Sequence, residues 1–267
     1  MAKITPESRS QFAEVSQPYK DLIQKVLEKE KSMLLIIERD SFGLGYKKLL
    51  LAEEMIYLST LYMTINNLSV EILDAKNTDA LNEARKILYR AVIYLEEIVT
   101  NYIDVPFADY EENLKEIANT PLEKRYYLVR KLGLAISLLI EAYGTNTKWK
   151  WAFVELQGRY ATVAKNIFDM KEGSKSYFDL RSHDYDTTVE YFRLVKKLLA
   201  DSANRYRERY ELSTRRLDDM RLAINYLSAL YRVHIAISEK SEAEEIKKKA
   251  TVWKDKMDND RKKGQNS

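Results

Sequence analysis

The chain has 267 residues, of which 44 are Lys or Arg, 41 are Asp or Glu, and none is Cys. The lack of Cys excludes disulfide bonds, thiolate zinc sites, iron–sulfur clusters and thiol nucleophiles. A formal net charge of +3 is close to balance, so no overall field favours nucleic acid or an anionic membrane, and with 45% hydrophobic residues the chain can fold around a core.

Apolar residues recur at alternating spacings of three and four along nearly the whole chain, and the alternation typical of strands is nowhere sustained. This spacing is typical of the apolar stripe that one helix presents to a neighbouring helix. In chain order, the stripes cover residues 51–72, 81–102, 122–143, 149–170, 189–210, 217–234 and 243–257. The sequence therefore predicts an all-α fold of about nine mostly long helices.

Capping residues predict where several helices begin. An N-cap side chain accepts a hydrogen bond from an otherwise unpaired backbone N–H, and an acid three residues later can bond back to the cap. Four such signals are Asp109 with Glu112, Thr120-Pro121-Leu122-Glu123, Thr187-Thr188-Val189-Glu190 and Ser241-Glu242-Ala243-Glu244. Further breaks are predicted at Pro18, at Gly43-Leu44-Gly45, at Asn77-Thr78-Asp79, at Gly144-Thr145-Asn146-Thr147 and in a loop from Gly173 to Asp186.

Between residues 187 and 238 the apolar stripe continues without Gly or Pro, which is compatible with one very long helix. The charges favour a hairpin at Ser213-Thr214 instead. Basic residues that suit a helix C-terminus precede this point, and Asp218 and Asp219, which suit a helix N-terminus, follow it.

The short connections predict that consecutive helices are antiparallel. Two architectures fit this pattern: an array of helical hairpins, as in an α-solenoid or tetratricopeptide-like superhelix, and two joined helical bundles. The tetratricopeptide pattern itself is incomplete, because Ser228 stands at its small position after Leu227 and no Pro closes the repeat. We expect residues 1–267 to form one domain, with subdivision points near residue 105 or within 173–186, and the charged end, 258–267, to fray.

The chain offers little for metal or cofactor chemistry, because His183 and His234 are its only histidines. Helical di-iron proteins carry Glu-x-x-His on two helices, but the residues three before these histidines are Leu180 and Tyr231. His234 lies in an apolar stripe and is interpreted as a structural, hydrogen-bonded imidazole. We expect no catalytic residue, no metal and no cofactor, and predict that the protein is not an enzyme.

Tyrosine occurs nineteen times, and rings with a polar tip are enriched at protein interfaces. Core packing competes with this interpretation for tyrosines inside the apolar stripes. The tyrosines outside the stripes are therefore the more informative ones, and these include Tyr19, Tyr127, Tyr191 and Tyr226.

The segment from Arg193 to Arg216 contains eight basic residues and three acids. Arginines interleaved with aromatic rings can bind phosphates, stack on bases or hold the carboxylates of a protein partner, although arginine near a helix C-terminus also simply complements the helix dipole. The candidate partner-binding residues are Arg205, Tyr206, Arg209, Tyr210, Arg215 and Arg216.

The predicted function is a helical scaffold or adaptor that binds another protein or a second copy of itself through a surface rich in Tyr and Arg. One alternative is a nucleic-acid-associated protein that uses the basic strip from Arg205 to Arg216, and another is a small-molecule binder or enzyme with a pocket between helices. The sequence shows no membrane-spanning stretch and no secretory signal, so a cytoplasmic location is expected, with a periplasmic one as the alternative if a signal has been removed.

Overall fold

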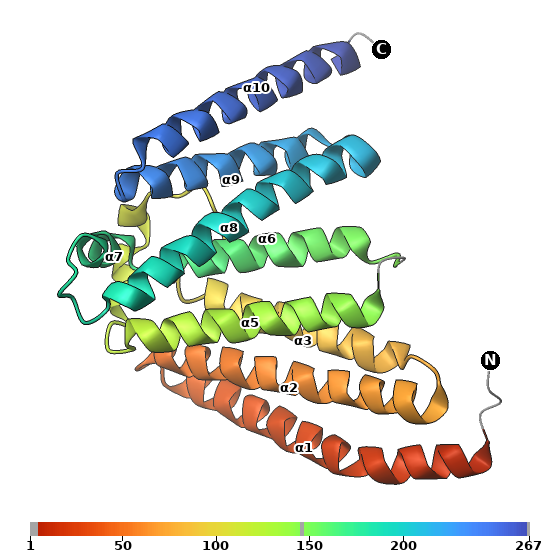
Figure 1. The fold of residues 1–267 in the computed structure, drawn as a ribbon. Coiled ribbons are helices and arrows are strands. Elements are labelled where there is room, and N and C mark those ends of the chain that lie inside the picture. Colours follow the sequence, from red (N-terminus) through yellow and green to blue (C-terminus); the bar gives the residue numbers. More distant parts are fainter. Residues whose placement is uncertain (1–4, 145–146, 266–267) are drawn as a thin grey trace. The chain divides into compact units, whose positions relative to one another are not determined.

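The computed structural model describes residues 5–144 and 147–265. Within these residues every regular element is a helix and there is no strand, which confirms the predicted all-α class (Figure 1). Ten α-helices occur there, together with one 3₁₀ turn and one π-helical turn. None of the described helices combines the length and the apolar character that crossing a bilayer requires. Thr145 and Asn146, part of a predicted break, lie outside the described residues.

The chain divides into two compact units. Unit 1 comprises residues 1–98 and 128–147, and unit 2 comprises residues 99–127 and 148–267. The predicted subdivision near residue 105 lies close to the first boundary, whereas the other predicted point, 173–186, lies inside unit 2. Folding of the whole chain as one domain stays a prediction.

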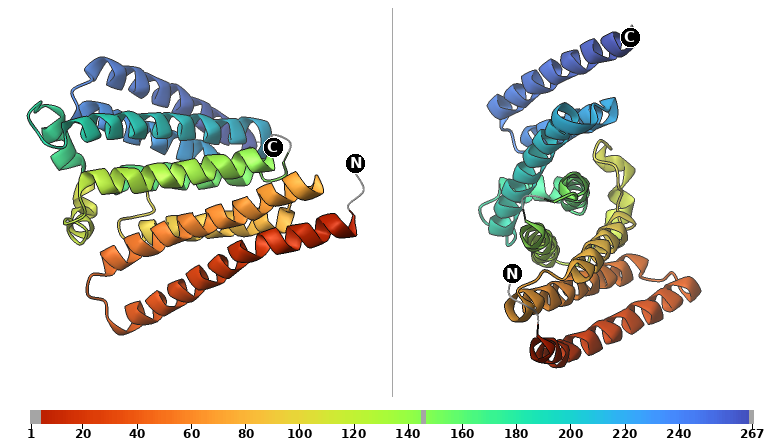
Figure 2. Two further views of the ribbon diagram at one scale, coloured as in Figure 1. Left: turned by 60° about the horizontal axis from the view of Figure 1, so that its bottom comes forward. Right: turned by 90° about the vertical axis from the view of Figure 1, so that its right-hand side faces the viewer.

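Unit 1 is built from α1 (Pro6–Arg39), α2 (Leu44–Leu73), α3 (Thr78–Glu96) and most of α5 (Leu122–Tyr143). Helices α1 and α2 form a hairpin, and α2 packs against both α1 and α3 (Figures 1 and 2). Buried residues on α2 surround most of the helix, including Leu51, Met55 and Leu58, so α2 is the central helix of this unit. Helix α1 buries only a narrow stripe and leaves the rest of its surface in solvent.

Unit 2 is built from consecutive short and long helices. Its elements are the 3₁₀ turn η1 (Phe107–Asp109), α4 (Glu111–Lys115), α6 (Lys150–Asn166), α7 (Met170–Tyr177), α8 (Tyr185–Arg209), the π-helical turn η2 (Tyr210–Thr214), α9 (Leu217–Ala236) and α10 (Lys240–Gln265). Helix α8 packs against α6, α7 and α9, and α10 packs against α9. Both units thus contain the expected helical hairpins, while the choice between a solenoid and two joined bundles stays a prediction.

The predicted break at Pro18 is wrong, because α1 continues through this residue for 34 residues in all. Proline removes one backbone donor and crowds the preceding turn, but it does not forbid a helix that tertiary packing holds on both sides. Here Ser16 lies before Pro18 and Ile23 after it, and both are buried.

The capping signals placed helices correctly but missed their first residues. Helix α8 begins at Tyr185 rather than after Thr187, because the Thr188 N–H donates to the Asp184 carbonyl (2.8 Å). Ser241 lies inside the first turn of α10. Helix α4 begins at Glu111, after the 3₁₀ turn that contains Asp109, and α5 begins at Leu122, one residue later than the Thr120 cap predicts.

Two expected irregular segments are helical. Part of the predicted loop from Gly173 to Asp186 belongs to α7, whose first turn is capped by the Asp169 carboxylate accepting from the N–H groups of Lys171 and Glu172 (both 3.0 Å). Residues 258–265, the described part of the end expected to fray, belong to α10, and the fraying itself stays a prediction.

The predicted hairpin between α8 and α9 is confirmed. Helix α8 loosens into the π-helical turn η2, and Arg215 then takes a left-handed conformation (φ 52°) that ends it. The buried Asp219 carboxylate, in the first turn of α9, holds the junction together. It forms an ion pair with Arg209 and accepts a hydrogen bond from the Thr214 hydroxyl (2.5 Å).

Candidate functional site

The two tyrosines of the predicted partner-binding strip lie in the core of unit 2. The Tyr206 ring is buried and stacks on Tyr226, with ring centres 5.5 Å apart. Tyr210 is also buried, and its hydroxyl donates to Asp260 (2.7 Å). Burial and this hydrogen bond raise the pKa of Tyr210 to about 12. Neither ring is presented to a partner.

The arginines of the strip are divided between internal contacts and the surface. Arg209 pairs with Asp219 and lies 4.8 Å from the centre of the Tyr206 ring. Arg207, also in this segment, pairs with Glu211 (3.1 Å). Arg215 and Arg216 are exposed, and Arg205 is half-buried. The structure therefore does not bring the six candidate residues together on one surface.

His234 is buried as expected and belongs to a hydrogen-bonded group. Its Nδ1 lies 2.6 Å from an oxygen of Glu239, which also pairs with Lys196 (2.7 Å). Burial alone would raise the pKa of Glu239, but the hydrogen bonds from Lys196 and His234 outweigh it and hold that pKa below its ordinary value. Within the described residues no three His, Asp or Glu side chains are grouped to hold a metal ion.

The sequence interpretation missed a buried lysine. Lys165, near the end of α6, is only 5% exposed, and its ammonium donates to the Tyr110 hydroxyl (3.2 Å). Among the residues that the structure describes, no carboxylate pairs with it. Burial and the charge of Arg232 lower the pKa of Lys165 to about 8, although Asp104 opposes the shift. One signal was available, because Lys165 interrupts an otherwise largely apolar run from 161 to 168.

An exposed apolar surface lies at the turn between α1 and α2. We call it the hairpin tip and define it by Leu35, Ile36, Phe42 and Tyr46. The Phe42 side chain is 85% exposed, and the other three are between 36% and 48% exposed. Single exposed apolar residues are ordinary on protein surfaces, whereas groups of them mark interaction sites, and these four lie at the end of α1, in the connecting turn and in the first turn of α2.

The turn that carries Phe42 is firmly built. The Asp40 carboxylate accepts from the Phe42 N–H (2.9 Å), and the Lys47 ammonium donates to the Asp40 carbonyl (2.8 Å). The hydrogen bond from the Phe42 N–H, and after it one from the Lys47 ammonium to the Asp40 carboxylate (3.3 Å), lower the pKa of Asp40 below its ordinary value. Gly43 follows with φ 65°, a conformation that favours glycine. Phe42 is therefore held outward by an ordered backbone. Helix α2 begins within the break that the sequence analysis predicted at Gly43-Leu44-Gly45.

The sequence pattern of the TP0443 family matches residues 8–261, so the chain belongs to this family. No curated protein matches it. The family's description names no activity, and function is therefore inferred from the geometry.

Proposed function

We propose that this member of the TP0443 family is a non-enzymatic helical scaffold that binds a protein partner through the hairpin tip. The observation that carries the proposal is the 85% exposure of Phe42 on an ordered turn. Burying an aromatic side chain of this size in a partner stabilises a complex by about 1.5–3 kcal/mol. A rigid turn also loses little conformational entropy on binding, which favours affinity.

The charges around the hairpin tip favour a protein partner with an apolar pocket and a neutral rim. Lys47 is paired with Asp40 (3.3 Å), and Lys48 is paired with Glu97 (3.1 Å). These cations are already neutralised, so they add little attraction for a phosphate backbone or an anionic bilayer. The basic strip gives weaker support to the nucleic-acid alternative, because two of its arginines, Arg207 and Arg209, form ion pairs within the fold.

The proposal is tested by placing a photo-crosslinking amino acid at position 42, identifying the captured partner, and measuring its affinity for purified variants. Phe42→Ser should weaken that affinity by about tenfold or more while leaving the melting temperature unchanged, because Phe42 makes little contribution to the core. The matched control is Leu212→Ser, which removes another apolar side chain (72% exposed) from a helix connection in unit 2 and should have no effect. Equal affinities for the Phe42→Ser protein and the unchanged chain would refute the hairpin tip as the binding site.

A further inference from the structure

Helices α2 and α5 present an apolar face to solvent in unit 1. The two helices lie side by side and run in the same direction (Figures 1 and 2). Its four apolar side chains are between 40% and 61% exposed, and a group of this kind is typical of an interaction site. We call this surface the paired-helix face and define it by Leu50, Glu53 and Tyr57 on α2 and by Lys131, Leu134 and Leu138 on α5.

Both rows of the paired-helix face have the spacing of a helix–helix contact. Residues 50, 53 and 57 on α2, and residues 131, 134 and 138 on α5, follow steps of three and four and so share one side of each helix. Helix α5 is apolar on its opposite side as well, where Leu132 and Leu139 are completely buried. A helix that is apolar on both sides is typical of one that is covered on both sides. The paired-helix face therefore fits further helices.

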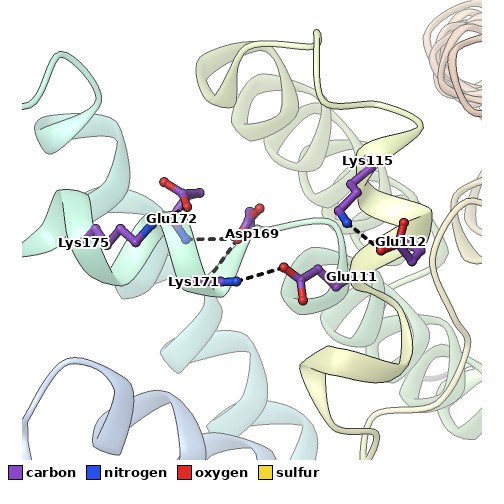
Figure 3. Close-up of polar contacts among 7 residues, drawn as sticks. All are labelled: Glu111, Glu112, Lys115, Asp169, Lys171, Glu172 and Lys175. Carbon is purple, nitrogen blue, oxygen red and sulfur yellow. Dashed lines mark hydrogen bonds and ion pairs between the residues drawn. The ribbon is translucent and has the colours of Figure 1, made fainter.

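An ion pair fixes the alignment of the two rows. Lys131 Nζ lies 2.5 Å from a carboxylate oxygen of Glu53. Other exposed pairs, such as Lys115 with Glu112 in unit 2, join residues three apart on one helix and do not align two helices (Figure 3). Because Glu53 and Lys131 belong to neighbouring parallel helices, their opposite charges stand at the same height along these helices.

We propose that the paired-helix face binds a second copy of this chain. The face is self-complementary, because its acid and its base stand at equal height on adjacent helices. When the two-fold axis of the dimer runs parallel to the helices, α2 of one copy lies over α5 of the other. Glu53 then faces Lys131 of the second copy, and Tyr57, about one turn further on, faces Leu134. The dimer thus combines apolar contacts with two ion pairs between the copies.

The charges disfavour the other symmetric arrangement of the same face. With the two-fold axis across the helices and centred on the ion pair, α2 would lie over α2 of the second copy, and α5 over α5. Glu53 would then face Glu53, and Lys131 would face Lys131. Like charges placed opposite each other strongly weaken an interface. The ion pair therefore selects the dimer in which the paired helices of the two copies run parallel.

The proposed dimer is tested by sedimentation velocity of the full-length chain over a series of concentrations. We expect a monomer–dimer equilibrium that shifts toward the dimer as the concentration rises. Glu53→Lys and Lys131→Glu should each weaken dimerisation by about 100-fold or more, because each places like charges opposite each other at two symmetric points. Glu83→Lys is the matched control, because Glu83 forms an exposed ion pair with Lys86 on α3 (2.6 Å) and does not belong to the face. It should leave dimerisation unchanged, and circular dichroism confirms that each variant is folded.

A mixture of the two charge-reversal variants tests the arrangement itself. In an equimolar mixture of Glu53→Lys and Lys131→Glu, each of the two charges on one chain faces the opposite charge on the other chain. The two variants should therefore form a one-to-one heterodimer, although neither dimerises alone at the same concentration.

Two apolar substitutions separate this face from the hairpin tip. Leu134→Ser should weaken the dimer by about 100-fold, because the two-fold symmetry removes a leucine from the interface twice. Phe42→Ser should have no effect, since Phe42 does not belong to the paired-helix face. The inference thus goes beyond the proposed function and does not rest on it.

The inference is overturned if the chain remains monomeric at the highest concentration at which it stays soluble. It is also overturned if the mixture of Glu53→Lys and Lys131→Glu contains no heterodimer, or if folded Leu134→Ser protein dimerises as tightly as the unchanged chain. A dimer that Phe42→Ser abolishes and Leu134→Ser retains would place self-association at the hairpin tip and would equally reject the paired-helix face.

Discussion

Replacing Lys165 by Met tests the energetic consequence of the buried ammonium. Burial lowers the pKa of Lys165 from 10.5 to about 8, a difference that corresponds to about 3 kcal/mol of lost stability near pH 7. Methionine has a similar length and carries no charge. It gives up the hydrogen bond to Tyr110, which contributes about 1 kcal/mol. We therefore expect Lys165→Met to stabilise unit 2 by about 2 kcal/mol at pH 7.

The effect should depend on pH in a defined direction. Below about pH 8 the lysine is protonated in both the folded and the unfolded chain, so the full cost of burying the charge is present. Between about pH 8 and 10.5 the folded chain releases this proton first, the unfolded chain then binds more protons, and stability rises with pH. The unchanged chain should recover about 2 kcal/mol between pH 7 and pH 9.5, which closes the gap to Lys165→Met.

Urea unfolding followed by tryptophan fluorescence measures this gap. All three tryptophans, Trp149, Trp151 and Trp253, belong to unit 2, so the signal reports on the unit that contains Lys165. When the two unfolding free energies are subtracted at each pH, the contributions of groups that titrate alike in both proteins cancel. Lys254→Met, which removes an exposed lysine of α10, serves as the control and should show no gap at any pH.

Two results would refute the reasoning about Lys165. One is a gap that stays constant between pH 7 and pH 9.5, which would show that the ammonium is not disfavoured in the folded chain. The other is a Lys165→Met protein less stable than the unchanged chain at pH 7, which would show that the hydrogen bond and cation–π contact with Tyr110 outweigh the cost of burial.

Three further substitutions in unit 2 have expected outcomes in the same urea assay. Gly158→Ala should destabilise the unit by about 2 kcal/mol, because the new Cβ would lie 2.6 Å from the Tyr206 ring, and an unchanged midpoint would show that this ring can move aside. Asp219→Asn should lower the free energy of unfolding by about 3 kcal/mol, since it leaves the largely buried Arg209 guanidinium without its counter-charge. A decrease of less than about 1 kcal/mol would contradict this account. Tyr191→Phe should stabilise the unit by about 1 kcal/mol, because the fully buried hydroxyl has no hydrogen-bond partner among the described residues, and a destabilised variant would mean that the hydroxyl is paired after all.

The helical class and much of the core could be predicted from the spacing of apolar residues. Leu88 and Leu199 were placed in apolar stripes, and both are completely buried. The rule fails where a helix ends before its stripe does. Tyr102 continues the stripe of α3, but that helix ends at Glu96 and the Tyr102 ring is 68% exposed. Periodicity records which residues share a helix face only as long as the helix continues.

The candidate site was harder to predict, because its residues depend on contacts between distant parts of the chain. The sequence analysis treated Arg209 as a charge available to a partner. In the structure the turn after α8 places Asp219 next to Arg209, and the two form an ion pair. Tyr191 and Tyr226 lie outside the stripes and were therefore treated as more informative about an interface than the tyrosines inside them. Both are buried, because several helices surround α8 and α9. Phe42 directly precedes the break predicted at Gly43-Leu44-Gly45 and was not singled out. Nothing in the local sequence shows that the hairpin leaves this ring uncovered.

The contacts of Arg125 predict that its own identity is constrained in evolution, whereas the identities of residues 117–120, which it holds, are free to change. Its guanidinium donates to main-chain carbonyls, those of Ile117, Ala118 and Thr120. Every amino acid supplies a carbonyl, so Ala118 and its neighbours can change identity over evolution without losing these bonds, whereas only an arginine offers several donors in a planar fork. An alignment of TP0443 family members should therefore show drift between 117 and 120 beside a retained arginine at 125.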